Sequence, residues 1–154
     1  MRSLVEKGLI GGLSAVAMTL LTATQAESAS FTVEGNRLRI ELPETVSVQP
    51  ASQFGVEIAV SDRIKIIVET LADETSIPEY KKETLANTGI FQRFVVDSAT
   101  VLLHEDTILG KPAFRVFTYV DTGKVKLTCR DNRVIDLTEA EARKVIQICQ
   151  SIRS

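Results

Sequence analysis

The chain has 154 residues, of which 44% are hydrophobic and 25% charged, and its formal net charge at pH 7 is −2. This composition is typical of one globular domain and excludes a disordered or low-complexity chain. Two cysteines and one histidine are too few for a multi-cysteine zinc or iron–sulfur site, or for a metal site made of paired histidines. The sequence therefore predicts no metal ion and no cofactor.

Residues 1–26 have the three-part layout of a secretory signal peptide. Arg2 and Lys7 give a basic start, an apolar run follows over 9–21, and small side chains end the segment at Ala26. The apolar run is shorter than the roughly 20 residues that an ordinary membrane span needs. We therefore predict cleavage after Ala26 and export of a soluble chain to the periplasm, with an uncleaved membrane anchor as the alternative.

The mature chain, residues 27–154, is predicted to be a single domain because it contains no internal repeat and no linker. Loss of the signal segment leaves 16 basic and 19 acidic residues, a net charge of −3 over 128 residues. A nucleic-acid-binding surface usually needs a basic stripe, which this balance does not favour. We therefore expect no nucleic-acid partner, and because the mature chain contains no second long apolar run we expect no membrane span after removal of the signal.

Alternation of polar and apolar residues predicts strands in the first half of the mature chain, because successive side chains of a strand point to opposite faces. A short strand over 31–33 and a second over 37–42 flank a turn at Gly35. The runs 53–60 and 63–69 predict a hairpin whose alternate apolar residues share one face.

The second half of the chain predicts more strands. Apolar runs over 100–104 and 113–120 come first, and an unbroken alternation over 124–130 follows a turn at Gly123. A last strand is predicted over 133–137.

Two helices are predicted, each opened by a Ser/Thr-x-x-Glu capping box. The first begins at Ser76 and ends before Gly89, and the second begins at Thr138. The residues expected on the buried sides are Ile77, Tyr80, Thr84 and Leu85 in the first helix, and Ala142, Val145, Ile146, Cys149 and Ile152 in the second. Runs of strands interrupted by two helices indicate an α+β fold, a mainly antiparallel sheet with helices packed on it.

The two cysteines are predicted to form a disulfide. Cys129 continues the inward series of the strand over 124–130, and Cys149 lies on the buried side of the last helix. Both side chains therefore point into the layer between helix and sheet, and exported compartments are oxidising. The alternative is a pair of buried free thiols that act as small apolar side chains.

No motif in the sequence predicts a catalytic residue. His104 is the only imidazole, and its neighbour Glu105 would lie on the opposite side of a strand, so we expect a surface histidine at a strand end. The acidic pairs 73–74 and 105–106 are assigned to solvated loops, with calcium binding as the alternative. A mixed surface is expected where basic residues alternate with acidic ones near the last helix, at Arg130, Arg133, Arg143 and Lys144.

Short motifs along the whole mature chain resemble the Mog1/PsbP-like group of small domains, which includes periplasmic proteins of the DcrB type. The motifs are the early strand pair from Phe31 through 37–43, the helix start at 77–80, the turn and strand start at 108–113, and the helix end at 148–152.

The resemblance implies an α/β/α sandwich around a mainly antiparallel sheet and no enzyme activity, because the group serves mostly as binding and accessory modules. Some proteins of similar fold are periplasmic immunity proteins that block toxins delivered by type VI secretion. The expected function is therefore an exported, non-enzymatic protein-binding module, in its most specific version an immunity or inhibitor protein. A small-ligand carrier and a hydrolase that uses scattered carboxylates are the alternatives.

Overall fold

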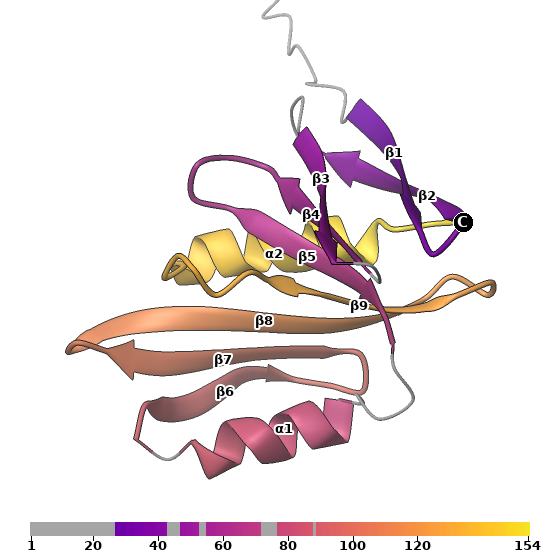
Figure 1. Ribbon diagram of the computed structural model, residues 1–154. Helices are drawn as coiled ribbons and strands as arrows, with labels where there is room; N and C mark the ends of the chain where they lie inside the picture. The colour runs from indigo at the N-terminus through magenta and orange to yellow at the C-terminus, as the bar shows by residue number, and fades with distance from the viewer. Residues whose placement is uncertain (1–26, 43–46, 53–54, 72–76, 88) are drawn as a thin grey trace, which may run out of the picture.

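The structure is a computed structural model that describes residues 27–42, 47–52, 55–71, 77–87 and 89–154. The predicted signal segment 1–26 lies outside these residues, as do the acidic pair 73–74 and Ser76 of the first capping box. The described chain forms a large antiparallel sheet, a separate hairpin and two helices (Figure 1). The α+β class and the mainly antiparallel sheet are thereby confirmed.

Seven strands of the described chain form the main sheet, in the order β3–β4–β5–β9–β8–β7–β6, and every neighbouring pair is antiparallel. Their bounds are Ser47–Ser52 for β3, Gly55–Ala59 for β4, Lys65–Thr70 for β5, Phe91–Asp97 for β6, Val101–Ile108 for β7, Lys111–Asp121 for β8 and Lys126–Asp131 for β9. The predicted hairpin is present as β4 and β5, although Gln53 and Phe54 lie outside the described residues.

The first two strands, β1 (Glu27–Val33) and β2 (Asn36–Leu42), form a separate two-stranded antiparallel sheet. Their turn consists of Glu34 and Gly35, which both have positive φ, 47° and 77°. Two positive-φ residues between paired strands define the type I′ turn, whose twist matches that of the strands.

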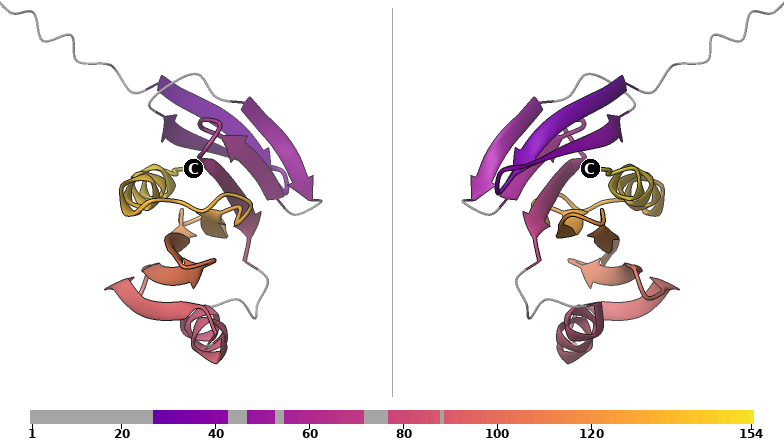
Figure 2. Two further views of the ribbon diagram at one scale, coloured as in Figure 1. Left: turned by 90° about the vertical axis from the view of Figure 1, so that its left-hand side faces the viewer. Right: turned by 90° about the vertical axis from the view of Figure 1, so that its right-hand side faces the viewer.

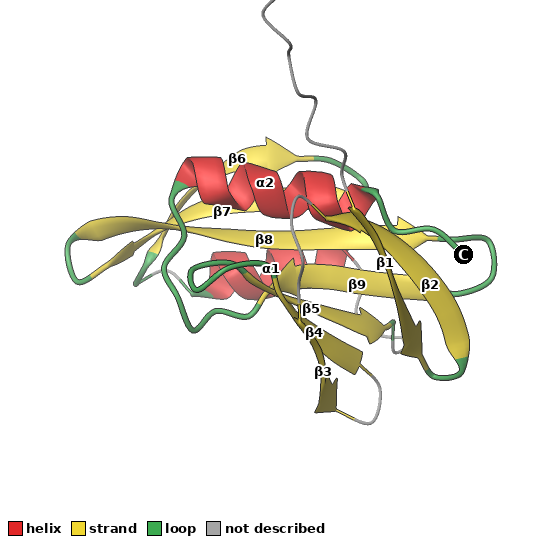
Figure 3. Ribbon diagram, turned by 90° about the horizontal axis from the view of Figure 1, so that it is seen from above, coloured by secondary structure: helices red, strands yellow, loops and turns green. Residues whose placement is uncertain are grey.

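The sheet is covered on both faces (Figures 2 and 3). One face packs against helix α2 (Glu139–Gln150) and against the β1–β2 hairpin, and the other packs against helix α1 (Ile77–Ala86). Strand β8 is buried on both sides because of this arrangement: Val116 and Val120 contact the α2 side, whereas Phe117 contacts the α1 side. Such double burial explains why β8 is almost continuously apolar in sequence.

Helix α2 begins as its sequence predicts. Thr138 is the N-cap, its side-chain oxygen accepts a hydrogen bond from the backbone N–H of Glu141, and the Glu141 carboxylate accepts from the backbone N–H of Thr138. The capping box is thereby confirmed. The buried side contains Ala142, Val145 and Cys149 as predicted, but Ile148 rather than Ile146 is fully buried.

Three expectations about the elements are wrong. Residues 133–137 do not form a strand but a loop with a single β-bridge between Leu137 and Phe114. Glu105 and Asp106 belong to β7, because the turn comes three residues later, at Leu109 and Gly110. Leu85 is exposed.

Candidate functional site

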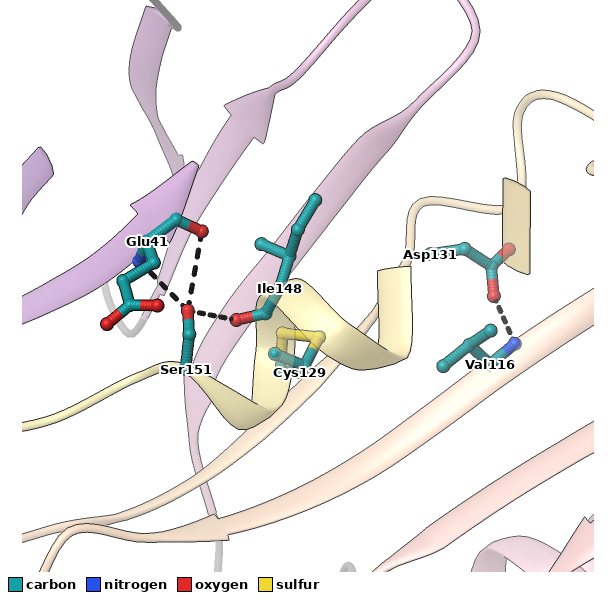
Figure 4. Close-up of a disulfide and its surroundings, with 7 residues drawn as sticks. Glu41, Val116, Cys129, Asp131, Ile148 and Ser151 are labelled. Atoms are coloured by element: carbon teal, nitrogen blue, oxygen red, sulfur yellow. Dashed lines mark hydrogen bonds between the residues drawn. A yellow bond between two sulfur atoms is a disulfide. The ribbon is translucent and has the colours of Figure 1, made fainter. Parts of the chain in front are cut away.

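The predicted cysteine pair lies under α2. The Sγ atoms of Cys129 in β9 and Cys149 in α2 are 2.00 Å apart, and both residues are fully buried in the main core (Figure 4). The geometry is that of a disulfide bond and agrees with the predicted pairing.

The helix end beside the disulfide is tied to strand β2. The Ser151 hydroxyl accepts a hydrogen bond from the backbone N–H of Glu41 at 2.9 Å and donates to the carbonyl of Ile148 at 2.7 Å (Figure 4). The backbones of Arg39 and Arg153 exchange two hydrogen bonds of 2.8 and 2.9 Å. The disulfide and these bonds have a structural role, since they join β9, α2 and β2 into one unit.

A cluster of buried polar side chains lies on the opposite face of the sheet, under α1. His104 is 4% exposed, and its Nδ1 lies 2.9 Å from Oδ1 of Asp106. The expected surface histidine is therefore wrong. Strand β7 continues through Ile108, and residues two apart in a strand share a face, so His104 and Asp106 point to the same side.

Tyr80 joins this pair from helix α1. Its ring stacks on Phe117 with the centroids 4.1 Å apart. Its hydroxyl lies 3.5 Å from Nε2 of His104 and accepts a hydrogen bond from Nη2 of Arg133 at 2.5 Å. A continuous series of polar side chains thus runs from the loop after β9 through α1 to β7. Its members are Arg133, Tyr80, His104 and Asp106.

Burial governs the protonation of the two rings. It lowers the pKa of His104 below its usual 6.5, although the carboxylate of Asp106 opposes this shift. Burial likewise raises the pKa of Tyr80, against the opposing charge of Arg133. Both rings are therefore neutral at pH 7. The neutral imidazole donates from Nδ1 to Asp106, and its Nε2 is left to accept from the Tyr80 hydroxyl.

Arg133 approaches the cluster from the loop after β9. Its backbone N–H donates to Oδ2 of Asp131 at 3.1 Å, its φ is 60°, and its guanidinium lies 5.2 Å from the centroid of the Tyr80 ring. Partial burial disfavours the charge, but Tyr80 and nearby carboxylates raise the pKa of Arg133 above its usual value. No carboxylate oxygen of the described residues lies within 4.0 Å of this guanidinium.

Arg115 differs because its charge is neutralised. It is buried in β8, Nη1 lies 3.5 Å from Asp131, and Nη2 donates to Asp136 at 2.6 Å. Asp131 itself is 2% exposed and also accepts from the backbone N–H of Val116 at 2.7 Å. Arg133 therefore provides the cation without a close carboxylate at this site.

A pocket of about 220 Å³ opens beside this cluster, between α1 and the ends of β7 and β8. Its lining residues are Tyr80, Glu83, Thr84, Asn87, Ile90, His104, Asp106, Ile108, Arg115 and Arg133. Convergent polar groups, a charged side chain and perturbed pKa values in one concavity are the usual marks of a binding site.

The basic residues near the last helix do not gather into a patch. Arg130 pairs with Glu69 at 3.1 Å, and Arg143 pairs with Glu139 along α2 at 2.7 Å. The mixed surface expected for them agrees with these pairs. Arg133 lies apart from them, at the pocket.

The pocket was not predicted from the sequence. The one local signal for it is the spacing of His104 and Asp106, which places an imidazole and a carboxylate side by side on one face of a strand. The other lining residues come from segments far apart in the chain.

Comparison with protein-family models, with curated proteins and with solved structures found no match to the chain. Neither helix of the described chain has the length and apolar character needed to cross a membrane. The described residues also contain no group of three or more side chains that could hold a metal ion.

Proposed function

We propose that the mature chain is an exported, non-enzymatic module that binds another protein in the periplasm. The predicted signal segment 1–26 supports export. The disulfide between Cys129 and Cys149 supports an oxidising compartment, where such bonds persist.

The observation that carries the proposal is a pair of exposed apolar side chains that are next in the chain to pocket-lining residues. Leu109 is 97% exposed and Val134 is 79% exposed. Each is the chain neighbour of a pocket-lining residue, Ile108 and Arg133 respectively. Exposed apolar side chains close in sequence to a pocket whose cation forms no close ion pair suit a protein segment that brings an anionic group and apolar contacts together. We name this surface, made of Leu109, Val134 and the pocket, the pocket face.

Neither the backbone conformation nor the packing of the fold favours leucine at position 109. It has φ of 51° in the two-residue turn between β7 and β8, with Gly110 at 78°. Asparagine, aspartate and glycine are preferred at this position of a type I′ turn, since a leucine there is strained. Nearly complete exposure also means that the side chain gains almost nothing from packing. Binding of a partner gives the leucine a role that folding does not.

The two helices on opposite faces of the sheet support the Mog1/PsbP-like α/β/α sandwich as the specific fold. An immunity or inhibitor protein against a secreted toxin is the most specific version of this proposal, because that role requires a compact exported domain with one binding face.

Hydrolysis is the second candidate, favoured by the His104–Asp106 pair in the pocket, which resembles the base and orienting acid of a catalytic site. The Tyr80 hydroxyl, however, faces Nε2 of His104, the atom that would act as the base. This arrangement supports binding rather than proton transfer.

Capture of the partner from periplasmic extract by the tagged mature protein tests the proposal. We expect one protein to be retained by the parent and lost with the double variant Leu109→Asn, Val134→Ser. The control Val48→Ser changes an exposed valine on β3, far from the pocket face in the strand order, and should retain it.

Leu109→Asn alone should raise the free energy of unfolding by roughly 0.5–1 kcal/mol, because asparagine suits the turn. Loss of capture together with unchanged or higher stability therefore cannot come from unfolding. Capture of nothing by the parent, or equal capture by the double variant, would refute the proposal.

A further inference from the structure

The pocket is lined by a cation with free hydrogen-bond donors, Arg133. The Arg133 guanidinium has five N–H donors, and a single hydrogen bond from it, to Tyr80, is present within the described chain. The Tyr80 ring lies against the guanidinium and fixes its position. A planar cation that is held in place with free donors is suited to bind a carboxylate through two parallel hydrogen bonds.

The other charges of the pocket restrict the ligand further. Asp106 and Glu83 line the same space as Arg133, while Arg115 is neutralised by Asp131 and Asp136. These two carboxylates would repel a dianion such as phosphate more strongly than a singly charged group, with which Arg133 can pair. The carboxylates also offer acceptors for an N–H group on the ligand.

Size and apolar lining agree with a small group. The volume of about 220 Å³ corresponds to roughly seven molecules of liquid water at ~30 Å³ each. Ile90 and Ile108 contribute apolar surface beside the charged groups. A carboxylate with an adjacent amide N–H and a small side chain is the chemistry found at the carboxyl end of a polypeptide.

We infer that the pocket binds the C-terminal carboxylate of the partner protein, with Arg133 as the residue that pairs with it. This inference rests on the proposed function and names the group that enters the pocket. Arg133 would face the carboxylate, and Asp106 or Glu83 would accept from the N–H of the last residue.

His104 provides the readout, because it is the single histidine of the chain and lines the pocket. The ring proton resonances of His104 in an untagged mature protein can be followed by NMR while a ligand is added. The probe is N-acetyl-alanyl-alanine, and its counterparts are the same dipeptide with a C-terminal amide, inorganic phosphate and acetate.

We expect a saturable shift with N-acetyl-alanyl-alanine and at least tenfold weaker binding of the three counterparts. Arg133→Gln should weaken dipeptide binding at least tenfold, since a charge-assisted pair is lost. The matched control is Arg143→Gln, which removes the same charge from an exposed helix position and should change binding less than twofold. Melting curves of both variants should overlap with that of the parent to within a few degrees.

Absence of a saturable shift would overturn the inference, as would equal binding of the amide, of phosphate or of acetate. Unchanged affinity in Arg133→Gln would overturn it as well. These failures are distinguishable from failure of the proposed function, because capture of a protein that depends on Leu109 and Val134 requires no carboxylate in the pocket.

Discussion

The environment of His104 combines two opposing influences on one imidazole. Burial disfavours the imidazolium, whereas the carboxylate of Asp106 at 2.9 Å favours it, and burial is the larger effect. Arg133 adds a smaller repulsion. The charge state of the His104 ring therefore depends on Asp106, two positions away in the sequence, and on Arg133, 29 positions away. Each of these side chains can be removed by a separate substitution.

Titration of His104 by NMR should give a pKa below the usual 6.5 in the parent. Asp106→Asn should lower this pKa further, because it removes the carboxylate that stabilises the imidazolium. Arg133→Gln should raise it by relieving the repulsion. A pKa that rises in Asp106→Asn would contradict the structure, because it would mean that the Asp106 carboxylate does not face the ring.

Among the helices and strands, α2 is the element whose first residue is fixed by the most specific side-chain contacts. The Glu141 carboxylate closes the capping box with Thr138 and also accepts two hydrogen bonds from Arg63 in the β4–β5 connection, at 2.6 and 3.2 Å. One side chain therefore connects the helix start to the opposite half of the sheet.

Glu141→Gln should destabilise the protein only above acidic pH. The hydrogen bond from Arg63 is the largest cause that lowers the pKa of Glu141 from 4.5 to about 2. A carboxylate with a lowered pKa contributes stability above its unfolded pKa and loses that contribution as the pH falls through the folded pKa. Glutamine keeps an acceptor for the cap but not the charge.

We expect Glu141→Gln to melt below the parent at pH 7, with a loss of about 1 kcal/mol or less, as for other exposed ion pairs. The difference should shrink between pH 4.5 and pH 2. Glu139→Gln, which removes the other acid of the first turn, is the control for the charge effect of the helix end. A difference that is the same at pH 2 and pH 7 would rule out the charge as its cause.

The strands that could be predicted from the sequence are those in which burial determines where the apolar residues stand. β4, β5 and β9 each have one face in the main core, and the period of two follows from that, whereas β8 was predicted from its apolar run because both of its faces are buried. β3 was missed because its side chains are exposed and it contains Pro50. β6 was missed because its aromatic residues are half-buried and its register shifts twice against β7.

At the scale of the whole molecule, the disulfide lies inside the main core, between the sheet and helix α2. It connects β9, in the middle of the main sheet, to the last helix, and the segment after that helix is bonded to β2. The paired cysteines could be predicted because each lies on a regular apolar face. The pocket could not, because its residues meet only after α1, β7, β8 and the loop before α2 have packed.

Reduction should therefore destabilise the entire domain. The disulfide joins residues 20 positions apart, for which loop-closure entropy gives about 3 kcal/mol. This corresponds to a fall in melting temperature on the order of 10 °C. Cys129→Ala should melt near the reduced parent, and Cys149→Ser lower still because it buries a hydroxyl in an apolar layer.

Calorimetry with and without reductant measures these differences, and reductant should leave both variants unchanged. Labelling of the denatured, unreduced protein should find no free thiol. Two reactive thiols per chain would contradict the pairing and would mean that α2 is held by packing alone.

The contact between β2 and the end of the chain has a consequence for the order of assembly. Glu41 bonds to Ser151, which is 110 positions further along, and Arg39 bonds to Arg153, the penultimate residue. Synthesis and translocation deliver a chain from its amino end, so the first hairpin emerges long before its anchor exists. Its contacts with β4 and β5 can form early, but its bonds to Ser151 and Arg153 cannot form until those residues have been made. In a chain that is delivered in this order, the bonds of β2 to Ser151 and Arg153 are therefore among the last tertiary contacts to form.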